Sequence, residues 1–168
     1  MQVGDRRSRV PALAAALCAT AALALAPGAN GATQAELGAQ RDLLAAVNQA
    51  RTARHLAPLR LSKVLSRPAR RHSAYLARTG RLDHSGADGR PFYVRLYAAG
   101  FSRRKAVGEN LGMAGGCSTD LSAKMVQMWL NSPGHRANLL SRAYRVVGIG
   151  VVAAADCSNT VYTTDFGG

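Results

Sequence analysis

The sequence places the imidazole of His135 and the carboxylate of Glu109 in two segments that contain glycine or proline, the residues with unusual backbone freedom or rigidity. His135 lies in an octapeptide, residues 129–136, that also holds a proline, a glycine and the single tryptophan of the chain. About twenty residues earlier, Glu109 directly follows Gly108, which allows unusual backbone geometry. Imidazole and carboxylate groups form zinc sites and the base–orienter pairs of hydrolases. We therefore expect a shaped polar site, serving either chemistry or binding alone.

Two of the four histidines are candidates for this site. His84 lies in a turn-like stretch, residues 82–86, and His135 begins a short predicted helix. His55 is expected at the end of a helix. His72 is expected inside a helix, where we interpret histidine as structural rather than catalytic.

Hydrophobic spacing predicts five helices that would position these residues. They cover residues 36–54, 62–79, 90–99, 120–131 and 135–140. Ser62 can cap the second helix, although Pro68 disfavours a helix interior and moves the expected start towards Ser66. Ser132 followed by Pro133 is typical of an N-cap and a first helical position.

Two strands are predicted near the C-terminus. They cover residues 145–152 and 160–166, are rich in valine, threonine and tyrosine, and are joined by a turn. Residues 59–61 look like a short extended link. Helices followed by closely spaced strands indicate the α+β class, with an antiparallel sheet covered by helices.

Residues 1–31 have the three parts of a secretory signal peptide. Arginines come first, an uncharged run of alanine and leucine follows at 11–26, and small residues lie at 29–32. The run is shorter than the roughly 20 residues that span a bilayer. We therefore expect a secreted, extracellular protein with no transmembrane segment after cleavage. A short N-terminal segment, residues 32–39, would precede a single domain at 40–168.

Removal of the signal peptide would leave two of the three cysteines, Cys117 and Cys157. Two cysteines in an exported protein usually form a disulfide. We predict this bond, which for a loop of this length stabilises the fold by roughly 4 kcal/mol.

The chain is strongly basic, with 22 basic and 9 acidic residues and a net charge of +13. Residues 1–31 hold three of the bases and one of the acids, so the mature chain would carry +11. Such a domain is expected to adhere to anionic envelope polymers or anionic lipid. Sparse aromatic residues and the lack of a nucleic-acid motif argue against specific recognition of nucleic acid.

Several short motifs occur in a fixed order along the chain. They are His84-Ser85, Gly108-Glu109-Asn110-Leu111, the segment 129–140, Gly148-Ile149-Gly150 and Thr164-Asp165-Phe166-Gly167. In this order they resemble a bacterial, SCP-like extracellular member of the CAP superfamily, which comprises cysteine-rich secretory proteins, antigen 5 and pathogenesis-related proteins. The resemblance covers about residues 40–167 and implies a three-layer α-β-α sandwich.

The resemblance also implies a cleft built from two histidines and acidic residues. Its residues here would be His84, Glu109 and His135, supported by Ser85, Asn110 and Ser132. The second acid of eukaryotic members would fall near Ser132 and is missing, which weakens a two-carboxylate mechanism. Asp83 and Asp88 lie nearby in sequence, but nothing in the sequence assigns either of them to the gap.

Three interpretations of this cleft remain open. The first is a binding cleft or structural network in which Asn110 and Asn138 bond to backbone groups. The second is a site for zinc or a similar divalent cation, with two imidazoles, one carboxylate and an open position. The third is a hydrolase site in which Ser85 is the nucleophile, a histidine is the base and Glu109 orients the base.

The function expected from the sequence is that of a secreted binding module. Its ligand would be a divalent metal, a lipid or an anionic envelope polymer. The alternative is a metal- or Ser/His-dependent extracellular hydrolase of the protease type, and a passive envelope component is a third option. The sequence leaves open whether the protein is an enzyme.

Overall fold

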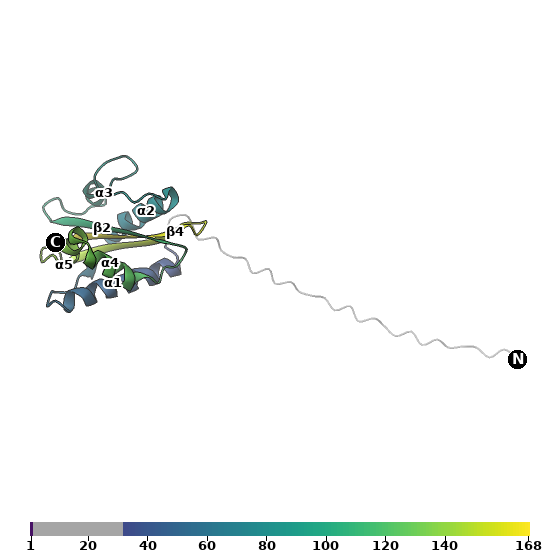
Figure 1. Cartoon of the computed structure of the whole chain (residues 1–168). Coiled ribbons are helices and arrows are strands. Elements are labelled where there is room, and N and C mark those ends of the chain that lie inside the picture. The colour runs from purple at the N-terminus through teal and green to yellow at the C-terminus, as the bar shows by residue number, and fades with distance from the viewer. Residues whose placement is uncertain (2–31) are drawn as a thin grey trace. The chain divides into compact units, whose positions relative to one another are not determined.

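The centre of the fold is a four-stranded sheet, shown in Figure 1 for a computed structural model that describes Met1 and residues 32–168. Its strands lie in the order β1 (Arg60–Leu61), β3 (Val146–Ala153), β4 (Asn159–Gly167) and β2 (Val107–Gly115). β1 is parallel to β3, and the other two pairs are antiparallel. The predicted signal peptide lies outside the described residues, apart from Met1.

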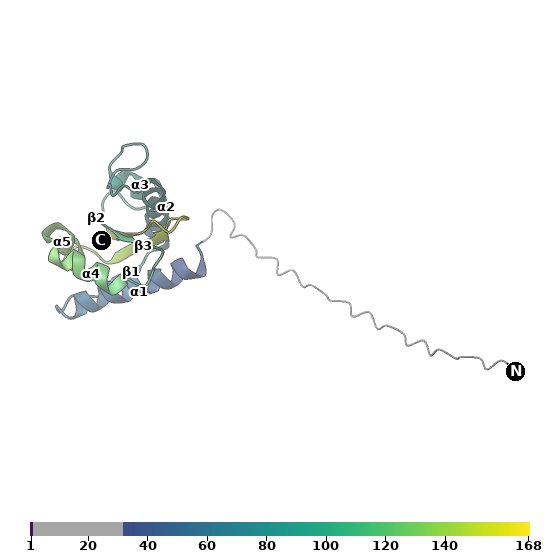
Figure 2. The ribbon, with the colours of Figure 1, turned by 45° about the vertical axis from the view of Figure 1, so that its right-hand side comes forward.

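Helices cover both faces of the sheet (Figure 2). One face carries α1 (Gln34–Thr52), α4 (Ser122–Asn131) and α5 (Pro133–Leu140), and the other carries α2 (Lys63–Thr79) and α3 (Phe92–Ala98). Because side chains alternate along a strand, Val147, Ile149 and Val151 of β3 all enter the core beneath α1 and α4. The arrangement is a three-layer α-β-α sandwich of the α+β class, as predicted.

The second helix lies unusually close to the sheet. A Cβ atom at Gly148 would collide with the backbone at Leu65, and one at Gly150 would lie 2.5 Å from the backbone of Ala69. The Ser73 hydroxyl donates a hydrogen bond to the Gly150 carbonyl at 3.0 Å. The two glycines of β3 thus set the distance between α2 and the sheet. This distance also positions residues 80–91, which follow α2.

The helix predictions are confirmed in number and order, with differences at their starts. α1 begins two residues earlier than predicted because Thr33 and Glu36 form a capping box. Ser62 caps α2 as predicted, but the start does not shift to Ser66. Pro68 lies inside the helix, where the cap and the buried face of α2 outweigh its missing N–H group.

The prediction of only two strands was wrong, since β1 and β2 complete the sheet. β1 is the short extended link, and it pairs in parallel with β3. β2 escaped prediction because its glycines lower strand propensity. Those glycines are required for packing, because a Cβ at Gly112 would collide with Met125 of α4, and one at Gly108 with the Tyr144 hydroxyl. Gly108 therefore serves close approach and not the unusual backbone angles that we expected.

The predicted disulfide is confirmed. Cys117 and Cys157 are bonded, with their Cα atoms 4.7 Å apart and a sequence separation of 40. The bond ties the chain after β2 to the turn between β3 and β4. Among the helices that the structure describes, none is both long and apolar enough to cross a membrane.

Candidate functional site

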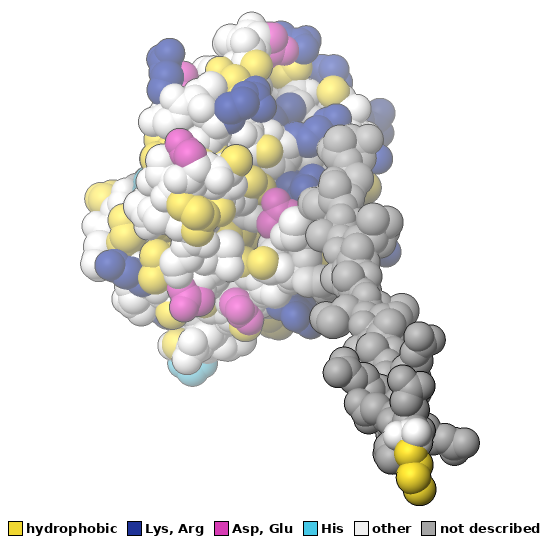
Figure 3. Space-filling model, turned by 90° about the vertical axis from the view of Figure 1, so that its right-hand side faces the viewer, with side chains coloured by type: hydrophobic (Ala, Val, Ile, Leu, Met, Phe, Trp, Pro, Cys, Tyr) yellow, Lys and Arg dark blue, Asp and Glu magenta, His cyan; other side chains and the backbone are white. Residues whose placement is uncertain are grey.

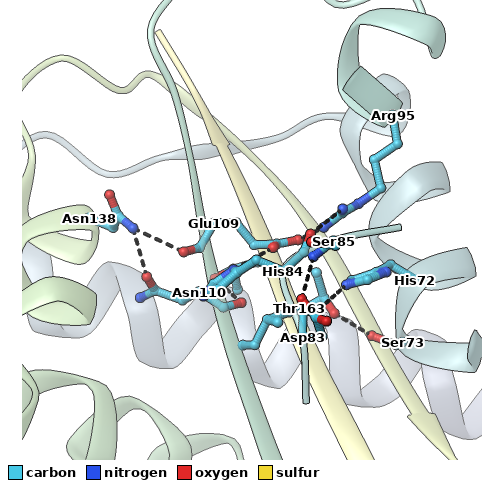
Figure 4. A network of polar contacts seen from close by, with 12 residues as sticks. His72, Ser73, Asp83, His84, Ser85, Arg95, Glu109, Asn110, Asn138 and Thr163 are labelled. Carbon is cyan, nitrogen blue, oxygen red and sulfur yellow. Dashed lines mark hydrogen bonds and ion pairs between the residues drawn. The ribbon is translucent and has the colours of Figure 1, made fainter. Parts of the chain in front are cut away.

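The site centres on the carboxylate of Glu109, whose side chain has no solvent exposure. One carboxylate oxygen, Oε1, lies 2.7 Å from Nδ1 of His84. The other oxygen, Oε2, forms an ion pair with the guanidinium of Arg95 (Figure 4). Arg95 also donates a hydrogen bond from Nη1 to the His84 carbonyl at 2.8 Å. Both oxygens of the buried carboxylate are therefore already engaged by side chains.

Three different parts of the chain bring these groups together. Glu109 lies on β2, Arg95 lies on α3, and His84 lies in the connection between α2 and α3. His72 of α2 holds that connection, since its Nε2 is 2.9 Å from the Asp83 carbonyl. Burial, together with the positive charge of Arg95, lowers the pKa of His72 to about 4. His72 is thus neutral at pH 7 and donates this hydrogen bond, the structural role that we expected.

His84 is the exposed member of the pair, with 54% of its side chain accessible to solvent. Partial burial and the nearby Arg95 charge lower its pKa, so the imidazole is neutral at pH 7. Because Glu109 accepts the Nδ1 proton, Nε2 of the neutral ring carries a lone pair. The site therefore presents one proton acceptor towards solvent.

His135 is only partly joined to this pair. Its carbonyl accepts a hydrogen bond from Nδ2 of Asn110 at 3.0 Å, which fixes the start of α5 to β2. Partial burial and, to a lesser extent, the charge of His84 lower the pKa of His135. Within residues 32–168, no hydrogen bond or ion pair joins the His135 ring to Glu109.

An amide pair supports the site from the opposite face of the sheet, as one of our interpretations expected. Nδ2 of Asn138 donates to the Glu109 carbonyl and to Oδ1 of Asn110, both at 3.0 Å. Ser132 was predicted to cap α5, and it does precede the helix, but its hydroxyl makes no capping hydrogen bond. The fixed backbone angle of Pro133 begins the helix without that bond.

The second acid of the site is Asp165. It lies in the motif at 164–167, and we had predicted no role for it. Asp165 of β4 lies directly opposite Glu109 in the sheet and is fully buried. In the described part of the chain neither of its carboxylate oxygens has a hydrogen-bond partner. Burial raises its pKa to about 7, although the charges of Arg95 and His84 oppose this shift.

The acids that we considered for the missing position are occupied elsewhere. Oδ1 of Asp83 accepts a hydrogen bond from the Ser85 amide at 2.8 Å, and Asp88 pairs with Arg90. Asp165 could have been found from its position, since an acid in a strand of mostly apolar and hydroxyl side chains is unusual. Nothing in the sequence distinguished Arg95 from the other arginines.

The donor set does not fit a divalent metal ion. No group of three or more His, Cys, Asp or Glu side chains among the described residues has the arrangement needed to hold one. Glu109 is bound at both oxygens, and Arg95 already supplies a positive charge beside it. Ser85 contacts Asp83, and no hydrogen bond joins it to a histidine in the part of the chain that the structure describes.

The three-layer sandwich thus presents a histidine–glutamate pair at its edge strand β2. The sequence profile of the family described as "CAP: Cysteine-rich secretory protein family" matches residues 44–166. The chain belongs to this family.

Protein YkwD of Bacillus subtilis (strain 168) is 31% identical over 128 residues, which are 76% of this chain and 46% of YkwD. The chain thus spans about half the length of this relative. An extracellular protein containing a SCP domain from Bacillus anthracis is 24% identical, with a TM-score of 0.66 over 78% of this chain and 40% of that one. An outer surface protein of Borrelia burgdorferi is 18% identical, with a TM-score of 0.63 over 77% of this chain and 92% of that one. These two structures share the fold.

Proposed function

We propose that the protein is an extracellular binding module that holds an anionic envelope polymer through the exposed face of α2. The observation that carries this proposal is a row of four exposed cations on that helix, which we name the basic ridge: Lys63, Arg67, Arg71 and Arg78. Their spacing of four, four and seven residues places them along one side of the helix. Figure 3 shows Lys and Arg side chains gathered over the part of the molecule where α2 and α3 lie.

The basic ridge is not neutralised by neighbouring acids. α2 contains no Asp or Glu. Glu36 of α1 pairs with Arg70 of α2 at 3.1 Å, and Arg70 is not part of the ridge. Within residues 32–168, no ion pair joins a ridge residue to an acid. A row of uncompensated cations attracts polyanions.

An extracellular location agrees with three features. The disulfide between Cys117 and Cys157 requires an oxidising compartment to persist. The N-terminal 31 residues have the composition of a signal peptide. The structural neighbours from Bacillus anthracis and Borrelia burgdorferi are described as an extracellular and an outer surface protein.

The proposal is tested by retention on an insoluble acidic polysaccharide, with a neutral polysaccharide as the blank. We expect the wild type to be retained and then released in about 0.5 M salt, where charges more than a few ångströms apart are screened. The variant Arg67→Gln/Arg71→Gln should elute much earlier. The matched control, Arg41→Gln/Lys124→Gln, loses the same charge from α1 and α4 on the opposite face of the sheet and should elute nearly as the wild type. Equal loss in both variants, or retention only on anionic lipid vesicles, would overturn the proposal.

A second candidate function, an extracellular hydrolase, is favoured by the His84–Glu109 pair alone. The neutral ring of His84 could accept a proton from a water molecule at Nε2 while Glu109 stabilises the resulting imidazolium. The activated water would then attack the electrophilic carbon of the scissile bond, and the imidazolium of His84 would return the proton to the leaving group as that bond breaks. A turnover assay on peptides and polysaccharides tests this option, because His84→Gln should abolish cleavage without lowering the melting temperature. Turnover that survives this change would refute it.

A further inference from the structure

Two adjoining cavities form a groove beside the basic ridge, between α2, residues 86–91 and α3. Their volumes are about 260 and 220 Å³. Both are lined by Arg71, Gly86, Asp88 and Arg95. Arg71 thus belongs both to the ridge and to the groove, whereas Arg67, one helical turn earlier, lines neither cavity.

The loop at the edge of the groove is held in one shape by its own hydrogen bonds. The Gly86 amide donates to the Arg90 carbonyl at 2.8 Å, and the Gly89 amide donates back to the Gly86 carbonyl at 2.9 Å. Gly89 adopts a left-handed backbone, with φ of 72°, which closes this turn. A preformed groove loses less entropy on binding than a mobile one.

Arg71 is the uncompensated charge of the groove. Asp88 is neutralised by Arg90, whose Nε lies 2.6 Å from Oδ2 of Asp88. Arg95 is neutralised by Glu109. Arg71 is exposed and, in the described part of the chain, has no acidic partner. The groove therefore favours an anionic group that reaches Arg71.

The walls of the groove add an apolar component. Pro68 and the ring of Tyr75 line the larger cavity on the side of α2. Each cavity is smaller than the roughly 300–1,000 Å³ of sites that enclose drug-sized ligands. The two small cavities share Arg71 in their lining. This arrangement fits two consecutive sugar units of a polymer, each with a compact ring, better than it fits one long acyl chain.

We propose that this groove binds two consecutive units of an acidic polysaccharide, each a sugar ring bearing a carboxylate, with Arg71 as the cation that contacts the carboxylate. Pro68 and Tyr75 provide the surface against which one sugar ring lies. This inference rests on the proposed function, since it names the ligand class and the subsite of the polymer that the basic ridge attracts. Arg is suited to the role because its planar guanidinium can bind a carboxylate through two parallel hydrogen bonds.

The test is calorimetric titration of the full domain with a galacturonate trimer, in wild type, Arg71→Gln and Arg67→Gln. The two variants lose the same charge from the same helix face, but only Arg71 lines the groove. We expect Arg71→Gln to weaken binding by about tenfold or more, as for loss of a charge-assisted hydrogen bond. Arg67→Gln removes only the general attraction of the ridge and should weaken binding several-fold less than Arg71→Gln does. Thermal melts of both variants verify that the domain is folded.

Each alternative outcome separates the groove from the ridge. Equal weakening in the two variants would overturn the groove while leaving polyanion binding by the ridge intact. If the wild type is retained on acidic polysaccharide but does not bind the trimer, the groove proposal is likewise overturned and the ridge proposal stands. If the wild type binds no polyanion at all, both proposals are refuted. Equally tight, Arg71-dependent binding of inorganic triphosphate would overturn the assignment to a sugar, because triphosphate offers no ring to Pro68 and Tyr75.

Discussion

Asp165 and Glu109 lie directly opposite each other on neighbouring strands, on the sheet face that α2 and α3 cover. Residues opposite each other in an antiparallel pair project to the same side, so two carboxyl groups are buried next to each other. Only Glu109 has an ion pair, with Arg95. One arginine therefore neutralises one acid, and burial favours the protonated form of the other.

The first prediction concerns the pH dependence of stability that Asp165 imposes. Its pKa is about 7 in the folded protein and near 3.8 when unfolded, so the folded state binds more protons between these values. Stability contributed by this group is full below about pH 4 and is lost as the pH rises to about 7. At about 1.4 kcal/mol per pKa unit, the loss is on the order of 4 kcal/mol.

The near-isosteric Asp165→Asn should remove this pH dependence, so the gain in stability of the variant over wild type should grow from pH 4 to pH 8. Parallel stability curves from urea unfolding would contradict this prediction.

The second prediction concerns the buried ion pair. Glu109→Gln would leave the Arg95 cation, only 16% exposed, without its carboxylate. Breaking one side of a buried pair costs about 3–5 kcal/mol, so we expect a loss of this size in urea unfolding at pH 7. The double variant Glu109→Gln/Arg95→Met should recover much of the loss, because no unpaired charge then remains. Additive effects of the two substitutions would show that the pair is not coupled.

The third prediction concerns the close contact between α2 and β3. Gly148→Ala would drive its methyl group into the backbone of α2 at Leu65, which must then move. We expect a loss of about 1–3 kcal/mol or more, as for overpacked cores. Gly115→Ala is the matched control in β2, where an added Cβ meets no atom within 4 Å. Equal melting temperatures for the two variants would mean that α2 does not rest on this glycine.

The fourth prediction concerns the titration of His72. Because its folded pKa is lowered to about 4, the unfolded chain binds more protons below the usual value of 6.5. This group therefore removes stability as the pH falls from about 6.5 to about 4, a loss on the order of 3 kcal/mol. NMR titration of the imidazole carbons should show His72 titrating well below the usual histidine value of 6.5. A His72 ring that titrates near 6.5 would contradict the buried, neutral state.

Sequence patterns predicted the parts of this fold that depend on local physics. Residue type and order predict the cap at Ser62, the start of a helix at Pro133 and the pairing of Cys117 with Cys157. The strand at 107–115 did not follow, because Gly108 and Gly112 lower strand propensity and their close contacts with Tyr144 and Met125 arise only in the folded protein.

The site was predictable in the same partial way. The resemblance to CAP proteins brought His84 and Glu109 together, and the structure joins them by a hydrogen bond. Arg95 and Asp165 were missed because their roles arise only when α3 and β4 meet β2 in space. The interpretation as a metal site did not take Arg95 into account. The sequence could not show that Arg95 occupies one side of the Glu109 carboxylate.

The most direct test of the account is one incubation of the mature protein with a soluble acidic polysaccharide of known chain length. The fraction of polymer bound and the chain length after release in about 0.5 M salt are both measured. We predict that the polymer binds to wild type, binds far less to Arg67→Gln/Arg71→Gln, and is recovered at its original length. Polymer that is shortened by wild type and left intact by His84→Gln would contradict the account and identify the protein as a hydrolase.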